Sequence, residues 1–414
     1  MNILLIHQYF LSENEPGGSR FNQFVKYWAN MGHNVTVVAG TVNYSTGKKD
    51  EKYKGKWVIQ ERPSERVTIY RCYVSEGYNK SFLHRLWAYF SFTISSIWAC
   101  LLRIPKQDIM IVTSPPLFVG ITAILTYFFK RIPYVFEVRD LWPESAIDIG
   151  VLKNSMLIKL AYLVEKYSYK YAKKINVLTP AFRTILVEKK KVPPDKLVLI
   201  PNGADFDLFK PGPTNNWVRK HYNLQDKFVV AYLGAHGVAN NLISLLRVAE
   251  ACKDFEDIVF MLVGDGMEKE KLLSYAKEKG LSNVLFIPAQ PKSKVADFCR
   301  AADVCTAVLK KVETFKTVYP NKVFDYMSCA KPILIGIDGV ARELIEKSQC
   351  GFYVDPEDVE GFKKRILQLK ANPNLASELG QNGLNFVRTH FSREQLAEKY
   401  EKVLLELVKK DNNK

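Results

Sequence analysis

The chain alternates short apolar runs with longer amphipathic stretches from end to end. In the first half the apolar runs are rich in Val, Ile and Leu, and they cover 2–10, 34–40, 67–74, 108–114, 134–140, 174–180 and 197–203. Stretches with helical periodicity separate several of these runs. The pattern predicts strands connected by helices, and therefore a parallel sheet that is covered on both faces.

The same pattern restarts after the Phe-Lys-Pro sequence at 209–211. Strands are expected at 228–234, 258–264, 284–289, 303–309, 332–337 and 351–355, and helices from about 240, at 267–279 and at 322–329. A length of 414 residues exceeds one ordinary core and suits two domains. We therefore expect two doubly wound domains with a seam near 205–212. Ligands of such sheets bind beyond the carboxyl ends of the strands, so the loops there are the candidate site.

Composition supports a folded protein in a reducing compartment. Hydrophobic residues make up 47% of the chain and charged residues 25%. The seven cysteines include no CxxC pair and lie mostly in apolar contexts, so neither disulfides nor a zinc site is expected. The first residues enter a strand directly, without the basic and apolar regions of a signal peptide. We expect a cytoplasmic protein.

Positive charge is concentrated in the first half. Residues 1–200 contain 28 Lys and Arg against 15 Asp and Glu, which gives +13 of the total net charge of +16. Residues 151–200 alone contain eleven basic and three acidic side chains. Such a field attracts nucleic acid or an anionic membrane surface. A solvated lysine-rich face is the alternative explanation.

Two stretches in the same half are unusually apolar. Residues 86–102 carry no charge over 17 positions, and their aromatic residues are Trp87, Tyr89, Phe90, Phe92 and Trp98. Such a stretch fits an interfacial helix at a membrane surface, a buried core helix or a membrane span, and the sequence leaves the three open. The second stretch, 117–129, is expected to pack inside a domain.

Two loops of the first half carry candidate chemistry. Gly17 and Gly18 precede a helix that opens at Arg20, and paired glycines before a helix N-terminus allow an anion to approach the backbone, although an ordinary turn would look the same. The end of the strand at 134–140 and the loop after it carry more ionisable residues than solvation requires. They are Glu137, Arg139, Asp140 and Glu144. Mutual salt bridges are the alternative.

Three motifs carry a family resemblance. "IPNGADFDLFKP", "LVGDGMEKEKL" and "YPNKVFDYMSCAKPILI", in this order after the Gly-Gly loop, resemble the retaining glycosyltransferases of family 4, which have the GT-B fold. "TSPPLFVG" and "FEVRDLWPES" are similar to the subgroup of bacterial O-antigen and capsule enzymes that includes N-acetyl-L-fucosamine transferases. The resemblance covers essentially the whole chain. It implies an α/β fold with two doubly wound, Rossmann-like domains facing a cleft: an acceptor-binding domain at 1–205, a nucleotide-sugar-binding domain at 206–390, and a C-terminal helix at 391–414 that returns to the first domain.

The resemblance also implies donor-binding residues. Two glutamates of the family, which hold the hexose and the ribose, correspond to Thr317 and Asp325, so only the ribose contact keeps its carboxylate. Asn321 and Lys322 stand at a helix mouth that would neutralise the diphosphate of the donor. The family's cationic pair is missing from "GAHGVAN" at 234–240, where His236 could supply part of the charge. Lys322 is the expected substitute, and the alternatives are Lys310, Lys311 and Lys316. Further expected donor contacts are Gly17, Gly18, Gly234, His236, Gly264, Asp265, Gly266, Ala289, Pro320 and Val323.

For catalysis, many relatives have a histidine where Arg139 stands, and an arginine cannot act as a base. Asp140 is therefore expected to orient or deprotonate the acceptor hydroxyl, with Glu144 second, although helix capping or ion pairing would explain both. Arg20 and Glu137 are expected to contact the acceptor. The "DFD" sequence at 205–207 is spelled like a metal motif but lies at the seam, so no metal and no cofactor besides the nucleotide-sugar substrate are expected.

Three functions are compatible with the sequence. The first is a membrane-associated transferase that moves a sugar from a nucleotide sugar to a lipid-diphosphate-linked saccharide; the subgroup resemblance favours UDP over GDP as the nucleotide. The second is a UDP-sugar 2-epimerase of the same fold, which needs no membrane face. The third is a basic nucleic-acid-binding protein; this rests on charge alone, because we find no recognised binding module.

Overall fold

The computed structural model describes residues 1–12, 20–43, 47–77, 82–148, 150 and 152–412. Within them the chain forms two compact units. The first unit contains the described residues up to Pro201 together with the C-terminal residues from Arg393 onward, and the second contains 202–392. Each unit is an α/β domain built on its own sheet, as the alternating pattern predicts.

The first unit has an eight-stranded sheet in the order β3-β4-β2-β1-β5-β6-β7-β8. All neighbours are parallel except β3 and β4. The strands are β1 (Asn2–Ile6), β2 (Asn34–Gly40), β3 (Val58–Ser64), β4 (Val67–Cys72), β5 (Ile109–Ser114), β6 (Tyr134–Val138), β7 (Lys174–Val177) and β8 (Leu197–Leu199). Seven of them were predicted. β3 was missed because this edge strand is mostly polar and exposed, and it contains a proline.

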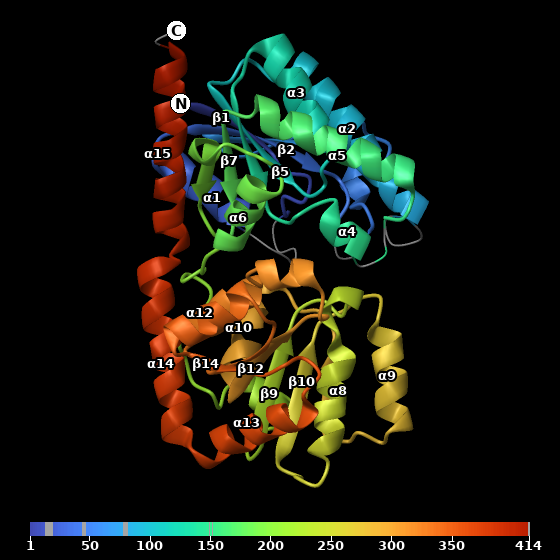
Figure 1. Ribbon diagram of the computed structural model, residues 1–414, viewed down its shortest axis with the longest axis vertical. Coiled ribbons are helices and arrows are strands. Elements are labelled where there is room, and N and C mark those ends of the chain that lie inside the picture. Colours follow the sequence, from blue (N-terminus) through green and yellow to red (C-terminus); the bar gives the residue numbers. More distant parts are fainter. Residues whose placement is uncertain (13–19, 44–46, 78–81, 149, 151, 413–414) are drawn as a thin grey trace. The chain divides into compact units, whose positions relative to one another are not determined.

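Helices cover both faces of this sheet (Figure 1). One face carries α1 (Arg20–Asn30) and α15 (Arg393–Asn412), and their core includes Ile3 and Leu5 of β1. Residues Leu4 and Ile6 point to the opposite face. There α2 (Phe82–Trp98), which continues as a π-helical turn to Arg103, packs on α3 (Val119–Lys130), and α3 packs on α5 (Ser155–Tyr171). The remaining helices are α4 (Glu144–Asp148) and α6 (Pro180–Glu188).

The apolar stretch at 86–102 forms most of α2 and the turn after it. Phe92 is fully buried, whereas Trp87, Ile94 and Leu102 are 56%, 51% and 69% exposed. No helix in the described parts of the chain has both the length and the apolar character that a membrane crossing requires. The second apolar stretch was expected to be buried, and this was wrong for its last turn. Phe128 and Phe129 of α3 are 52% and 71% exposed, because only the first turns of α3 lie over the sheet core.

The C-terminal helix is part of the first unit because aromatic side chains attach it to α1. The indole nitrogen of Trp28 donates a hydrogen bond to the carbonyl of Ala397 at 3.0 Å. The ring of Tyr400, which is fully buried, lies 5.7 Å from the ring of Trp28 and 6.1 Å from that of Phe24. Edge-to-face geometry of this kind stabilises aromatic clusters beyond the area that they bury.

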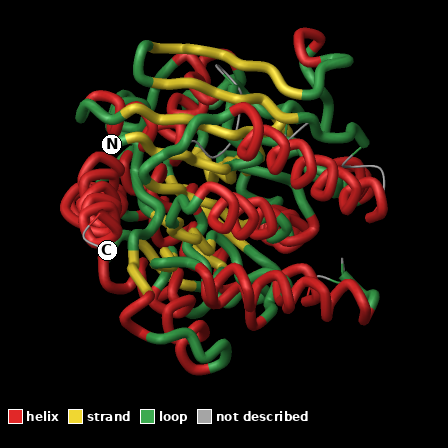
Figure 2. The backbone as a smooth tube through the Cα atoms, turned by 90° about the horizontal axis from the view of Figure 1, so that it is seen from above, coloured by secondary structure: helices red, strands yellow, loops and turns green. Residues whose placement is uncertain are grey.

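The second unit has a six-stranded parallel sheet in the order β11-β10-β9-β12-β13-β14. Figure 2 colours the strands of both units yellow and their helices red. The strands are β9 (Phe228–Leu233), β10 (Ile258–Val263), β11 (Val284–Ile287), β12 (Val304–Val308), β13 (Ile333–Gly336) and β14 (Gly351–Tyr353). All six were predicted, with ends one or two residues longer.

The helices of the second unit form two separate cores with the sheet. The first core joins one sheet face to α8 (Leu242–Ala251), α9 (Lys269–Glu278) and α13 (Val359–Ala371). The other core contains α7 (Trp217–His221), α10 (Lys292–Ala301), α11 (Asn321–Ser328), α12 (Val340–Ser348) and α14 (Pro373–His390). Both faces of the sheet are therefore covered, which explains why its strands read as continuous apolar runs.

The Tyr400 contact yields a stability prediction. Tyr400→Ala should destabilise the first unit by about 3–5 kcal/mol, because it leaves a cavity between α1 and α15. Denaturant unfolding followed by tryptophan fluorescence measures this, since Trp28 is in the cluster. Glu406→Ala, an exposed change on the same helix, is the control and should leave the midpoint unchanged. Equal midpoints for the two variants would contradict the packing described here.

Candidate functional site

In the first unit the candidate site lies where the connections reverse direction, between β1 and β5. His7 follows β1, and its Nδ1 is 2.7 Å from the hydroxyl of Thr113 on β5. Burial, and then the positive charge of Arg139, hold the pKa of His7 well below 6.5, so the imidazole is neutral at neutral pH. The sequence analysis missed His7. Its position directly after a buried strand was the signal that could have identified it.

Asp140 lies just past the end of β6, half-buried, and accepts a hydrogen bond from the hydroxyl of Ser145 at 3.1 Å. Burial raises the pKa of Asp140 to about 6, although the bond from Ser145 acts in the opposite direction. The group is therefore a carboxylate at neutral pH, and a stronger base than an ordinary aspartate. Arg139 is adjacent and also half-buried. The proposed role of Asp140 toward an acceptor hydroxyl stays a prediction.

Glu144 belongs to an ion-paired cluster. It begins α4 and is paired with Lys190, whose ammonium also lies 2.6 Å from Glu165 of α5. Burial raises the pKa of Glu165 to about 6 in spite of the nearby lysine. This geometry corresponds to the salt-bridge alternative considered for Glu144. A catalytic role for it would require its release from Lys190.

Arg20 and Glu137 are bonded to the protein itself. The guanidinium of Arg20 donates to the carbonyl of Ile200 at 2.9 Å, and its Nε lies 3.5 Å from Glu137. Glu137 has no exposed side-chain surface and accepts a hydrogen bond from Asn176 at 3.0 Å. The arrangement gives both residues a supporting role, joining α1, β6 and β7, and direct contact with an acceptor would require this cluster to open. Gly17 and Gly18 lie outside the described residues.

In the second unit the corresponding reversal lies between β9 and β12, where α11 meets the loop after β9. The ammonium of Lys322, in the first turn of α11, is 3.5 Å from the centre of the Tyr232 ring. A Cβ on Gly234 would come within 2.6 Å of that ammonium, so the lysine reaches directly over this loop. Asn321 begins the helix and is exposed. A cation and the first amides of a helix therefore face one loop, as diphosphate binding requires.

The loops after β9 and β10 pack backbone against backbone. His236 donates its amide hydrogen to the carbonyl of Asp265 at 2.9 Å. A Cβ on Gly264 would lie 1.9 Å from the carbonyl oxygen of Gly234, and one on Gly266 would lie 2.5 Å from that of His236. Only glycine fits at these two positions. Gly264 and Gly266 therefore hold the two loops together, whether or not they also approach a donor.

His236 is not the substitute cation. Its ring is fully buried, and neither ring nitrogen has a hydrogen-bond partner among the described residues. Burial, followed by the positive charge of Lys269, lowers the pKa of His236 to about 4. The side chain is neutral at neutral pH, so the positive charge of this site comes from Lys322.

The remaining predicted donor residues differ in what they have left to offer a ligand. Asp265 accepts hydrogen bonds from Lys269 at 2.6 Å and from the amide of Ala289 at 2.7 Å, so the amide of Ala289 is already paired and its carbonyl remains for a ligand. The side chain of Val323 is fully buried in the core, so only its backbone could meet a donor. Thr317 donates to Thr314 in the 3₁₀ turn before α11. Pro320 and Asp325 flank the mouth of α11, where their roles stay predictions.

At the seam, Asp205 is 4% exposed and 3.0 Å from the ammonium of Lys292. It also accepts a hydrogen bond from the amide of Leu208 at 3.3 Å. These contacts give Asp205 a local structural role, in line with the interpretation of "DFD" as a structural feature.

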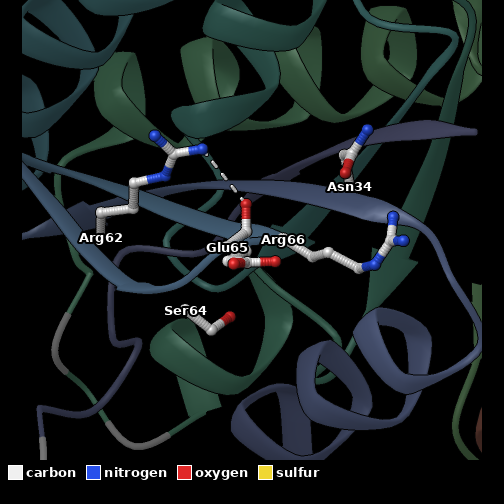
Figure 3. A pocket seen from close by; sticks show the side chains of 5 residues that line it. All are labelled: Asn34, Arg62, Ser64, Glu65 and Arg66. Atoms are coloured by element: carbon white, nitrogen blue, oxygen red, sulfur yellow. Dashed lines mark hydrogen bonds between the residues drawn. The ribbon is translucent and has the colours of Figure 1, made fainter.

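One surface hollow lies away from both candidate regions. It measures about 740 Å³ and is lined by Asn34, Arg62, Ser64, Glu65 and Arg66. Asn34 begins β2 and Arg66 precedes β4, so the hollow is at the amino edge of the first sheet. Figure 3 shows the two arginines extending in different directions, with Arg62 bonded to the carbonyl of Glu65. It is not the predicted site.

Comparisons with known proteins agree with the fold. Residues 17–203 match the family described as glycosyl transferase 4-like domain, and residues 214–386 match glycosyl transferases group 1. WcaI of Escherichia coli (strain K12), a glycosyl transferase assigned to colanic acid biosynthesis, is 24% identical over 399 residues, which cover 93% of this chain and 97% of WcaI.

Two solved structures share the architecture over nearly the whole chain. Sucrose-phosphate synthase from Thermosynechococcus elongatus has a TM-score of 0.75 at 17% identity, covering 98% of both chains. Anabaena Alr3699/HepE in complex with UDP-glucose has a TM-score of 0.73 at 15% identity, covering 98% of this chain and 100% of its own. The fold is GT-B, as expected. The protein is a glycosyltransferase whose two halves belong to the group 1 and 4-like domain families.

Asp140 provides a pH-dependent test of the first half-site. If its carboxylate assists removal of the acceptor proton, Asp140→Asn should lower kcat by about 100-fold or more while donor binding persists. Since the pKa of Asp140 is about 6, wild-type kcat/KM should fall as the pH drops through that value, and the variant should lack this decline. Ser145→Ala, which removes only the hydrogen bond, should shift the decline to higher pH. Full activity of Asp140→Asn would show that Asp140 has a structural role only and takes no part in proton removal.

Proposed function

We propose that this protein is a retaining, metal-independent glycosyltransferase that transfers a sugar from UDP to a lipid-diphosphate-linked saccharide at the cytoplasmic face of the cell membrane. The position of Lys322 and the α11 N-terminus over the loop after β9 is the observation that carries this proposal. The motif resemblance favours an N-acetylated amino or deoxyamino sugar. The bound UDP-glucose of HepE and the colanic acid assignment of WcaI support UDP as carrier and a surface polysaccharide such as O-antigen or capsule as product.

The chemistry follows from the charges at the two half-sites. The bond between the anomeric carbon and the diphosphate oxygen breaks, and its electron pair remains on the diphosphate. The acceptor oxygen forms the new bond to the same carbon and loses its proton, to Asp140 or to the departing phosphate. Lys322 and the amides of α11 stabilise the negative charge that gathers on the leaving group. Positioning and electrostatic stabilisation therefore provide most of the catalysis.

The acceptor requirement separates this proposal from its alternatives. Incubation with a panel of UDP-sugars should release UDP only when a lipid-diphosphate-linked saccharide is added, because transfer needs the acceptor hydroxyl. A UDP-sugar 2-epimerase would instead isomerise its substrate without acceptor. If UDP is released equally well without any acceptor, by hydrolysis, the transferase assignment is contradicted. Isomerisation of the UDP-sugar without acceptor would contradict it as well. Repeating the assay with a chelator tests metal independence, and anomeric configuration of the product by NMR tests retention.

A membrane surface is the partner that the outer face of the first unit suggests. On α5, Met156, Leu160, Leu163 and Tyr167 recur at helical spacing and are 78%, 38%, 50% and 38% exposed. The neighbouring helices α2 and α3 add Trp87, Ile94, Leu102, Phe128 and Phe129, all more than half exposed. We call these nine residues the outer apolar face. So many exposed aromatic and aliphatic side chains on one helical layer are unusual for a surface that meets only water.

Basic residues border this face. Lys159, Lys166 and Lys170 of α5 are exposed and repeat at the same helical spacing, three positions after Met156, Leu163 and Tyr167. Apolar side chains flanked by lysines match an anionic bilayer, in which the rings and aliphatic groups enter the interface while the ammonium groups remain at the headgroups. Nucleic acid would use the charges and leave the aliphatic groups without a partner. The face therefore favours a membrane over nucleic acid.

Liposome flotation tests the outer apolar face. The wild type should float with vesicles that contain anionic lipid and should be partly released by high salt, since each lysine near the surface contributes about 1 kcal/mol. Leu163→Glu should reduce flotation, because it places a charge in the apolar stripe. Leu273→Glu is the matched control: Leu273 is 38% exposed on α9 of the second unit, and its change should have no effect. Wild-type protein that stays in the soluble fraction at low salt would overturn the membrane assignment.

A further inference from the structure

Lys322 is held by an aromatic ring instead of a carboxylate. Its ammonium is 3.5 Å from the centre of the Tyr232 ring, and it forms no ion pair with any residue that the structure describes. Tyr232 is itself fixed, because it is fully buried and its hydroxyl donates to the carbonyl of Ala235 at 2.9 Å. A ring face attracts an ammonium, but by less than the hydration that burial removes.

Gly234 provides the space for the ammonium. Its φ of +149° lies outside the usual range of other residues, and a Cβ there would come within 2.6 Å of Nζ and 3.1 Å of Cε of Lys322. Gly237, three residues further along the loop, is different, since a Cβ there would meet only Asn240 at 3.4 Å. The position of the lysine therefore depends on Gly234, whereas Gly237, at an ordinary φ of −100°, does not approach it and serves for comparison.

The charges around Lys322 do not compensate for its burial. Asp325, one turn further on α11, is the only described group that favours the ammonium form. His236, on the loop after β9, is buried and neutral, and beyond it Asp265 and Lys269 pair with each other at 2.6 Å. Burial is the larger effect, and it lowers the pKa of Lys322 to about 7. The half-buried Lys322 therefore loses its proton more easily than an exposed lysine does.

We propose that Tyr232 and Gly234 form a seat for the ammonium of Lys322, and that the donor diphosphate binds at this seat together with one proton. The inference rests on the proposed function, because it requires a nucleoside diphosphate ligand. Solvent supplies the proton to Nζ, and no covalent bond changes. When the nucleoside diphosphate leaves after transfer, the proton returns to solvent. Loss of this proton near pH 7 weakens the attraction between Lys322 and the diphosphate, and it thereby assists product release.

The sign of the pH dependence follows from this linkage. Two negative phosphates raise the pKa of Lys322 in the complex above its value in the empty site, so binding takes up a proton between the two values. Affinity should therefore fall as the pH rises above about 7, by up to tenfold per pH unit. The last ionisation of a phosphate occurs near pH 6, so this range reports on the protein and not on the nucleotide.

Calorimetric titration of the full chain with UDP tests the proposal, with GDP as a second probe. The wild type should lose affinity from about pH 7 to 9. At about pH 8, buffers of different ionisation enthalpy should reveal uptake of up to one proton. Lys322→Arg keeps its charge throughout this range, so its UDP affinity should be nearly independent of pH. Lys322→Ala should bind weakly at every pH and take up no proton.

The seat is tested by three further variants, with thermal unfolding as the check on folding. Gly234→Ala should weaken UDP binding by about tenfold or more and Gly237→Ala by less than about twofold, because only the first places a Cβ against the ammonium and strains the backbone that carries it. Tyr232→Phe keeps the ring and should retain proton uptake. Wild-type UDP binding without proton uptake, or equal effects of the two alanine variants, would overturn the inference while leaving the proposed function intact. A chain that binds no nucleoside diphosphate would overturn both.

Discussion

Parallel pairing of β1 with β5, and of β9 with β12, is the constraint on which both halves of the protein depend. Parallel strands need crossover connections, and each sheet places later strands on both sides of its first strand. The connections therefore leave the two central strands in opposite directions, and a crevice forms at their carboxyl ends. The bond between His7 and Thr113, which are 106 positions apart, and the contact of Lys322 with Tyr232 are consequences of this topology.

The crowded strand ends also set the protonation of the candidate groups. Burial lowers the pKa of His7, raises that of Asp140 to about 6 and lowers that of Lys322 to about 7. In each case the uncharged form is favoured, because a closely packed sheet edge offers little water and few compensating charges. Arg20 and Glu137 differ, since each compensates the other. Asp140 and Lys322, whose pKa values lie closest to 7, are therefore the groups expected to exchange protons during transfer.

In the helical layer of the first unit, α5 carries apolar side chains on two sides. The inner side of α5 packs on the domain core through Ala161 and Val164, whereas Leu160 and Leu163 point outward. The proposed membrane surface would give the outward leucines an apolar neighbour. Asn154 caps this helix by accepting hydrogen bonds from the amides of Met156 and Leu157, so its boundary is set locally, whatever lies on the outer side.

The sequence by itself determined the two sheets, nearly all of their strands, and the helix mouth at Lys322, because apolar periodicity and Pro or Gly positions are local properties. Only the tertiary structure decided which of these elements meet. His7 is bonded to Thr113, Asp265 uses the amide of Ala289, and Phe129 is exposed. The two hydrogen bonds depend on the order of the strands in each sheet, and the exposure of Phe129 depends on which end of α3 lies over the core. A pattern along the chain records which face of an element is apolar, but it does not record the neighbour that covers that face.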